Sequence, residues 1–313
     1  SEIIQYHGYP SEEYHIETED GYILTVFRMP HGRYNGADKD SRPAVFLQHS
    51  LLGDAFHWIS NQPNSSLGFI LADVGYDVWI GNRRGSIYSS NHKTLNPSEK
   101  KFWDFSFHEM GYYDIPAVID FILNKTGHKQ LYYIGHSEGS TTGFIALCAW
   151  PKLAEKIKVF FALAPTTTIT FATTPMLKLG AAYETVFHSR MDVYAAHCPS
   201  GTSGKNFIHW IQINRAKLFQ AYDYGSAEKN MEKYNQTAPP TYKIEDIKIP
   251  IAIWTGGHDL FLDPRDAAML VSRISNLVYE KHIAEWQHFD FIWGLDAPER
   301  MYMDIIKIMK KYL

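Results

Sequence analysis

The chain has 313 residues, a hydrophobic content of 45%, a charged content of 20% and a formal net charge of −4. This length suits one large α/β domain with or without an insert, and the weak negative charge gives no reason to expect nucleic acid or an anionic membrane as partner. The 15 histidines are scattered, without an HExxH motif or a Cys/His cluster of metal-binding spacing. We therefore expect neither a metal nor a cofactor.

The N-terminal region and the glycosylation sequons of the chain indicate the secretory route. No apolar run reaches transmembrane length, and the first residues form no signal-like apolar region, so we expect that a signal peptide has been removed. Sequons begin at Asn64, Asn124 and Asn235. Cys148 and Cys198 are compatible with one disulfide or with free thiols, and the apolar surroundings of Cys148 favour a buried free thiol.

Strand–helix alternation is predicted over the first half of the chain, after a surface lead-in at residues 1–20. The predicted strands cover residues 21–29, 43–48, 76–80 and 131–134, and the predicted helices cover residues 67–73 and 114–125. The run at 43–48 is short and apolar throughout, as buried parallel strands are. The alternation predicts a mostly parallel sheet with helices on both faces.

The alternation breaks after a strand predicted at 159–164. Residues 166–208 are rich in Thr, Gly and Ser and show no clear sheet pattern, so we interpret them as a small cap insert over the sheet. The pattern resumes with a strand at 249–255, a helix at 264–274, a strand at 277–283 and a final helix from Ala297. The predicted organisation is a core of residues 1–165 and 209–313, interrupted by the cap.

A serine at a sharp turn follows the strand predicted at 131–134. The segment Gly135-His136-Ser137-Glu138-Gly139 fits the pattern G-x-S-x-G, and small residues suited to a helix come after it. The flanking glycines permit a turn too tight for side chains at those positions. The pattern alone is weak evidence, but its place between a strand and a helix is specific. It predicts a nucleophilic serine at the start of a helix.

A serine nucleophile needs a base, and the base needs a third group to hold it. In sheets of this type the acid and then the histidine follow the serine along the chain. The strand predicted at 249–255 runs into Asp259, which is our candidate acid. Asp259 also suits a turn or a helix N-cap, and Asp263 is the alternative because it precedes a helix start at Pro264.

The candidate base is His288, on the loop after the last predicted strand. The competing interpretation is a buried structural histidine among aromatic residues, and His258 and His282 are lesser candidates for the base. Asp290 is interpreted as a local structural acid. The order serine, Asp259, His288 and the position of each after a strand match a catalytic triad.

An oxyanion hole requires two backbone N–H groups aimed at the developing negative charge. One is expected from Glu138, directly after the serine, and the other from the loop at residues 49–52, with Leu51 favoured. The leucines of this loop are equally suited to simple packing against a helix. From position alone, the role of Leu51 stays open.

Short segments along nearly the whole chain resemble the acid lipases, the family of gastric lipase, lysosomal acid lipase and insect digestive lipases. They are GYPSEEY (8–14), TEDGYIL (18–24), LQHSLL (47–52), LADVGYDVW (71–79), GNRRG (81–85), FWDFS (102–106), YDIP (113–116), GHSEG (135–139), GS (225–226), GGHD (256–259) and HFDFIW (288–293). The resemblance implies an α/β-hydrolase core, a cap over the site, and hydrolysis of acylglycerols or sterol esters in secretions or lysosomes. On matching positions it implies Ser137 as nucleophile, Asp259 as acid and His288 as base, with the N–H groups of Leu51 and Glu138 as oxyanion hole.

Three departures from the family pattern affect the site. Ser50 replaces a glycine of the family's His-Gly-Leu-Leu loop, and Glu138 replaces a glutamine. A carboxylate beside a developing oxyanion is unfavourable unless it points away or is protonated. The third departure is the insert before His209, which is roughly half the family's usual length.

The leading hypothesis is a serine esterase or lipase that hydrolyses triacylglycerols or sterol esters through an acyl-enzyme. The alternatives are a carboxylesterase on soluble short-chain esters and a catalytically silent lipid-binding protein of the same fold. The expected partner is a lipid or ester substrate, with transient contact between the cap and a lipid interface. Packing on the core is an equally good interpretation of the apolar cap residues, which are Phe171, Met176, Leu177, Leu179, Tyr183, Val186 and Phe187.

Overall fold

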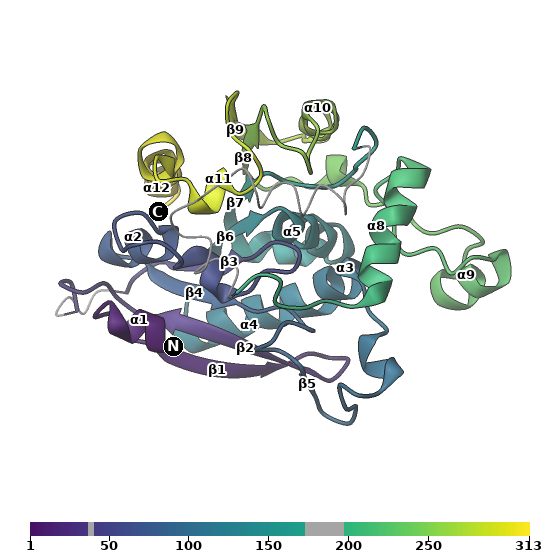
Figure 1. The fold of residues 1–313 in the computed structure, drawn as a ribbon, viewed down its shortest axis with the longest axis horizontal. Coiled ribbons are helices and arrows are strands. Elements are labelled where there is room, and N and C mark those ends of the chain that lie inside the picture. The colour runs from purple at the N-terminus through teal and green to yellow at the C-terminus, as the bar shows by residue number, and fades with distance from the viewer. Residues whose placement is uncertain (37–40, 173–196) are drawn as a thin grey trace.

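The computed structural model describes residues 1–36, 41–172 and 197–313 (Figure 1). The strands are β1 (Glu12–Glu17), β2 (Tyr22–Met29), β3 (Ala44–Gln48), β4 (Asp77–Gly81), β5 (Asn91–His92), β6 (Leu131–His136), β7 (Ile157–Leu163), β8 (Ile251–Gly256) and β9 (Leu277–Ile283). The α-helices are α1 (Glu2–Tyr6), α2 (Leu67–Asp73), α3 (Phe107–Glu109), α4 (Ile115–Thr126), α5 (Glu138–Ala149), α8 (Gly204–Ala216), α9 (Ala227–Tyr234), α10 (Pro264–Arg273), α11 (Asp290–Trp293) and α12 (Met303–Lys311).

One central sheet organises the described part of the chain, with the strand order β1-β2-β4-β3-β6-β7-β8-β9 and β5 beside β2. The strands from β4 to β9 along this order pair in parallel, whereas β1 with β2 and β2 with β4 pair antiparallel. The parallel strands therefore share one carboxyl edge, where loops from β3, β4, β6, β8 and β9 meet. Ligand sites of open α/β sheets lie at this edge.

Alternate residues of each buried strand face opposite sides of the sheet. In β3, Val45 and Leu47 belong to one core cluster and Ala44 and Phe46 to another. The first cluster includes residues of α2, α11 and α12, and the second includes residues of α4, α5 and α10. Burial on both faces explains the continuous apolar runs of these strands. The predicted architecture, a mostly parallel sheet with helices on both faces, is confirmed (Figure 1).

Two local predictions need correction. The predicted lead-in contains β1, which pairs antiparallel with β2 from Glu12↔Arg28 to Glu17↔Ile23. The expected final helix from Ala297 begins as a π-helical turn at Pro298–Tyr302 and continues as α12. Among the described helices, none is long and apolar enough to cross a membrane.

Most of the predicted cap lies outside the described residues. Met176, Leu177, Leu179, Tyr183, Val186 and Phe187 belong to that part. The described start of the insert packs on the core, because Asp266 of α10 accepts hydrogen bonds from the N–H groups of Thr170 at 2.9 Å and Phe171 at 3.0 Å. The described end contains α8, which runs across the predicted boundary at residue 208.

Candidate active site

Ser137 occupies a strained turn between β6 and α5. Its φ and ψ angles are 54° and −120°, which an L-residue adopts only where the surrounding structure enforces it. A Cβ on Gly135 would lie 2.6 Å from the backbone of Gly139, and one on Gly139 would lie 2.2 Å from the carbonyl oxygen of Gln48. Both glycines are thus required by close backbone approach. The turn presents Ser137 at the carboxyl edge of the sheet.

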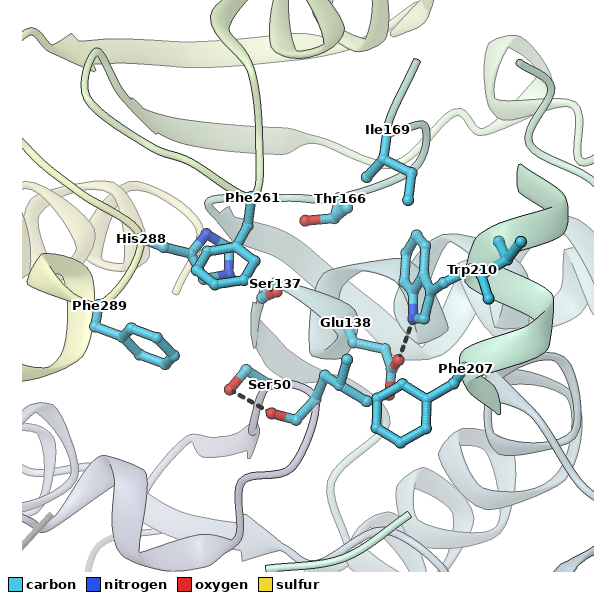
Figure 2. A pocket seen from close by; sticks show the side chains of 12 residues that line it. Ser50, Ser137, Glu138, Thr166, Ile169, Phe207, Trp210, Phe261, His288 and Phe289 are labelled. Carbon is cyan, nitrogen blue, oxygen red and sulfur yellow. Dashed lines mark hydrogen bonds between the residues drawn. The ribbon is translucent and has the colours of Figure 1, made fainter. Parts of the chain in front are cut away.

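The structure brings the three predicted triad residues into one hydrogen-bonded series (Figure 2). Oγ of Ser137 lies 2.7 Å from Nε2 of His288, and Nδ1 of His288 lies 2.8 Å from Oδ2 of Asp259. The other oxygen of Asp259 accepts hydrogen bonds of 2.8 Å from the N–H groups of Phe261 and Leu262. All three triad residues are buried. Because the carboxylate only accepts, Nδ1 of His288 carries a proton and Nε2 is left to receive one from the serine.

The alternative acid and bases lie elsewhere. Asp263 caps α10 by accepting a hydrogen bond of 2.9 Å from the N–H of Arg265. The side chains of His258 and His282 are exposed, and Nδ1 of His282 lies 2.9 Å from the Thr255 hydroxyl. Asp290 accepts a hydrogen bond of 2.6 Å from the N–H of Gln287, as expected of a local structural acid.

The expected oxyanion donors border the same pocket as Ser137. Leu51 follows β3, and Glu138 is the first residue of α5. Among the described residues, neither backbone N–H donates a hydrogen bond to another group. The carbonyl of Ser137 accepts from the N–H groups of Ser140 at 2.8 Å and Thr141 at 3.1 Å. Since C=O and N–H point in opposite directions across a trans peptide, this bonding turns the Glu138 N–H away from the helix.

The side chain of Glu138 points away from Ser137, toward α8 (Figure 2). Oε2 accepts hydrogen bonds of 2.6 Å from Nε1 of Trp210 and 3.0 Å from Nδ2 of Asn206. Oε1 pairs with the guanidinium of Arg83, and both partners are buried. The carboxylate is therefore compensated by a cation and does not face the oxyanion position.

Ser50 borders the pocket beside Leu51. Its side chain is buried, and its hydroxyl lies 3.3 Å from Nδ1 of His57. The strained residue of the loop is Leu52, with φ 59°, whose carbonyl accepts a hydrogen bond of 2.7 Å from the N–H of Ser200. The backbone at Ser200 thereby helps to hold the loop at residues 49–52 in place.

The pocket above Ser137 is lined mostly by apolar side chains. They are Leu51, Ile169, Phe207, Trp210, Ile211, Phe261 and Phe289, alongside Ser50, Glu138, Thr166 and His288. Side chains from the start of the insert and from α8 thus line one cavity together with Ser137 and His288 (Figure 2). Among the described residues, no group of three or more His, Cys, Asp or Glu side chains is placed to hold a metal ion. The chemistry open to this site is attack by the serine on an apolar acyl compound.

Comparisons with known proteins decide the family. Residues 1–62 match the partial α/β-hydrolase lipase region, and residues 43–188 match the α/β hydrolase fold. The chain is 48% identical to human lysosomal acid lipase/cholesteryl ester hydrolase, over 100% of this chain and 90% of that protein. It is 47% identical to mouse lipase member M, over 99% of this chain and 85% of that protein. The chain belongs to the acid lipase family.

Solved structures support the fold of this acid lipase. Esterase Pf2001 from Pyrococcus furiosus has a TM-score of 0.58 at 14% identity, covering 99% of this chain and 95% of that one. Naproxen esterase from Bacillus subtilis has a TM-score of 0.58 at 14% identity, covering 98% of this chain and 94% of that one. At this identity the likeness speaks for the α/β-hydrolase fold alone.

Several side chains of this acid lipase site were not anticipated from its sequence. Arg83, Asn206 and Trp210 hold Glu138, and Nε2 of His136 lies 2.8 Å from the carbonyl oxygen of His288. Burial keeps the pKa of His136 well below its ordinary value, so the neutral ring donates to that carbonyl. Two signals pointed to the region of Arg83: its place in a loop at the carboxyl edge of the sheet and the family-like segment GNRRG at 81–85.

The structure also shows that the two cysteines do not form a disulfide with each other. Cys148 lies half-buried on α5 and is not bonded to Cys198. Burial raises the pKa of the Cys148 thiol to about 12, so it is a poor nucleophile and is not a competing reactive group.

Proposed function

We propose that this acid lipase is a serine hydrolase that cleaves carboxylic esters of lipids, triacylglycerols or sterol esters, through an acyl-enzyme. The observation that carries the proposal is the hydrogen-bonded series Asp259–His288–Ser137, of which Ser137 and His288 line an apolar pocket. The human relative is named lysosomal acid lipase/cholesteryl ester hydrolase, which agrees with this substrate class.

The proposed reaction begins when His288 Nε2 takes the proton of the Ser137 hydroxyl as its oxygen attacks the ester carbonyl. Asp259 stabilises the imidazolium and keeps its Nδ1–H in place. The backbone N–H groups of Leu51 and Glu138 bind the oxyanion of the tetrahedral intermediate. His288 then protonates the leaving alcohol, and water activated by the same histidine releases the acyl group.

The lining of the pocket favours a long acyl chain over a short polar ester. Ile169, Phe207 and Ile211 lie beyond the triad and bury apolar surface when an acyl chain fills the space between them. Each buried methylene contributes about 0.8 kcal/mol. A butyryl ester would leave part of this surface unused.

We further propose that residues 166–208 form a shortened cap that contacts a lipid interface. Ile169 and Phe207, from its two ends, line the pocket. The alignment with the human relative spans 361 positions although this chain has 313 residues, so the relative contains segments that this chain lacks. The first fact supports a cover over the site, and the second agrees with a shortened one.

We propose a lysosomal or extracellular location for the enzyme. The sequon residues Asn64, Asn124 and Asn235 all have exposed side chains, so each is accessible to glycosylation. Treatment of protein from its native source with an N-glycosidase should lower its mass. An unchanged mass would speak against the secretory route.

The test of the proposed function compares wild type with Ser137→Ala on emulsified trioleoylglycerol, cholesteryl oleate and soluble p-nitrophenyl butyrate. Wild type should release fatty acid from an emulsified lipid, and the variant should lose at least about 10³-fold in kcat on every substrate cleaved. Turnover of the soluble ester alone would favour the carboxylesterase, and turnover by the variant would refute Ser137 as nucleophile.

A further inference from the structure

Arg83 connects the peptide unit that carries the Leu51 N–H to the side chain of Glu138, the residue with the other expected oxyanion donor. One nitrogen of its guanidinium, Nη1, pairs with Oε1 of Glu138, and Nη2 donates to the carbonyl oxygen of Ser50. Arg83 and Glu138 are both almost fully buried. A single planar group thus joins the loop after β3 to the start of α5.

The Ser50 carbonyl has a second donor. Nε2 of His49 accepts a hydrogen bond of 3.2 Å from the N–H of Arg83, so the proton of the neutral ring lies on Nδ1. Nδ1 is 2.9 Å from the Ser50 carbonyl oxygen and donates to it. The ring stays neutral because burial, with Arg83 nearby, holds the pKa of His49 well below its ordinary value.

The fixed carbonyl determines where the Leu51 N–H points. The C=O of Ser50 and the N–H of Leu51 belong to one trans peptide and point in opposite directions. Holding the carbonyl toward Arg83 and His49 therefore turns the N–H the other way, toward the pocket that Leu51 and Ser137 line. The Glu138 N–H is aimed similarly, by the bonds of the Ser137 carbonyl to the first turn of α5.

We propose that Arg83 is a positioning residue: it directs the Leu51 N–H through the Ser50 carbonyl, and it fixes the separation of the two oxyanion donors by holding the Glu138 carboxylate at the same time. Arginine suits this task because its rigid fork binds two acceptors at fixed spacing, whereas a lysine ammonium is a single point of charge. The carboxylate of Glu138 is the ion-pair partner that holds Arg83 in this position. This role explains why a glutamate directly follows the nucleophile. The proposal rests on the proposed function, since it concerns the stabilisation of its intermediate.

The experiment compares Arg83→Lys with Arg84→Lys as matched control. Arg84 is the neighbouring residue and equally buried, but it pairs with Asp20 and Asp114, neither of which lines the pocket. The concentration of active enzyme is determined by active-site titration with a fluorophosphonate. The readouts are kcat and KM for p-nitrophenyl butyrate, the affinity for an alkyl trifluoromethyl ketone, whose adduct carries an oxyanion, and the melting temperature.

Arg83→Lys should lower kcat about 10–100-fold and leave KM within threefold of the wild-type value. The affinity for the trifluoromethyl ketone should fall by a similar factor. Arg84→Lys should lower the melting temperature while kcat and ketone affinity stay within twofold. If Arg83→Lys lowers the melting temperature alone, with kcat and ketone affinity unchanged, the ion pair is purely structural and the proposal is wrong.

The double variant Arg83→Met with Glu138→Gln guards against misfolding, because it removes both charges together and leaves neither buried alone. It should melt higher than Arg83→Met yet keep the low kcat, since the Ser50 carbonyl still lacks the donor from residue 83 and is held by His49 alone. A double variant with wild-type kcat would overturn the proposal. Wild type without Ser137-dependent turnover would instead refute the proposed function, so the two failures are distinguishable.

Discussion

Trp210 of α8 donates a hydrogen bond of 2.6 Å from Nε1 to Oε2 of Glu138, the residue directly after the proposed nucleophile. The same indole lines the pocket, so one side chain both contacts the substrate space and holds the start of α5. This bond ties α8 to the turn that presents Ser137.

Trp210→Phe should remove this bond while keeping an aromatic ring in the pocket. A hydrogen bond to a charged group contributes about 1.5–3 kcal/mol, so the free energy of unfolding in urea should fall by that amount. The kcat for a short ester should stay within about threefold, because Arg83 and Asn206 still hold the carboxylate. In the control Trp150→Phe, where Nε1 donates to the neutral Tyr112 carbonyl, the loss should be about 1 kcal/mol. Equal losses in both variants would contradict the special role of Trp210.

Asp259→Asn should abolish the base function of His288 without moving it. Oδ1 of Asp259 accepts from two N–H groups, so the amide oxygen of asparagine must stay there and its NH2 group must face Nδ1 of His288. The imidazole then carries its proton on Nε2 and cannot take one from the serine. We expect kcat to fall about 10³–10⁴-fold.

Its control is Asp263→Asn, which replaces one good N-cap of α10 with another. Activity should stay within twofold. A large loss of activity in Asp263→Asn, together with an active Asp259→Asn, would show that Asp263 and not Asp259 is the acid of the triad.

The buried histidine His209 should make the fold sensitive to acid. Burial lowers its pKa to about 3, while the unfolded chain keeps a pKa near 6.5, so the unfolded state alone takes up this proton as the pH falls below 6.5. The stability contributed by the neutral ring is therefore present above pH 6.5 and lost progressively toward pH 3, by up to about 1.4 kcal/mol per pH unit. His209→Gln should flatten the dependence of the unfolding free energy on pH between 4.5 and 6.5, measured with urea. An unchanged slope would contradict this assignment.

Ile211 tests the acyl-chain interpretation of the pocket. It lines the cavity from α8 and is 41% exposed, so a charge there should not unfold the protein. Ile211→Asp should raise KM for p-nitrophenyl palmitate about tenfold or more and leave p-nitrophenyl butyrate within twofold, because only a long chain reaches it. The control Met303→Asp, 47% exposed on α12 and not part of the pocket lining, should change neither ester. Equal effects on both esters would place the acyl chain elsewhere.

Much of the fold could be predicted because burial on both faces leaves unbroken apolar runs, as in β3, β6 and β8. β1 escaped prediction because most of its side chains are at least partly exposed, and its pairing with β2 depends on a partner strand rather than on its own pattern.

The candidate triad could be predicted because each member follows a recognisable strand in a fixed order. The contacts of Glu138 could not, because Arg83 precedes it by 55 residues and Trp210 follows it by 72, and no periodicity links such positions. Position alone made Glu138 look unfavourable beside an oxyanion. Its partners in space remove that difficulty.

The central claim is that Ser137 forms an acyl-enzyme with help from His288. Its most direct test is mass spectrometry of the acid-quenched enzyme after brief exposure to p-nitrophenyl butyrate, with the protein digested to locate the adduct. We predict one butyryl group on the peptide that contains Ser137 in wild type, and none in Ser137→Ala. A butyryl group on another residue, or turnover with no adduct on Ser137 at any quench time, would contradict the account.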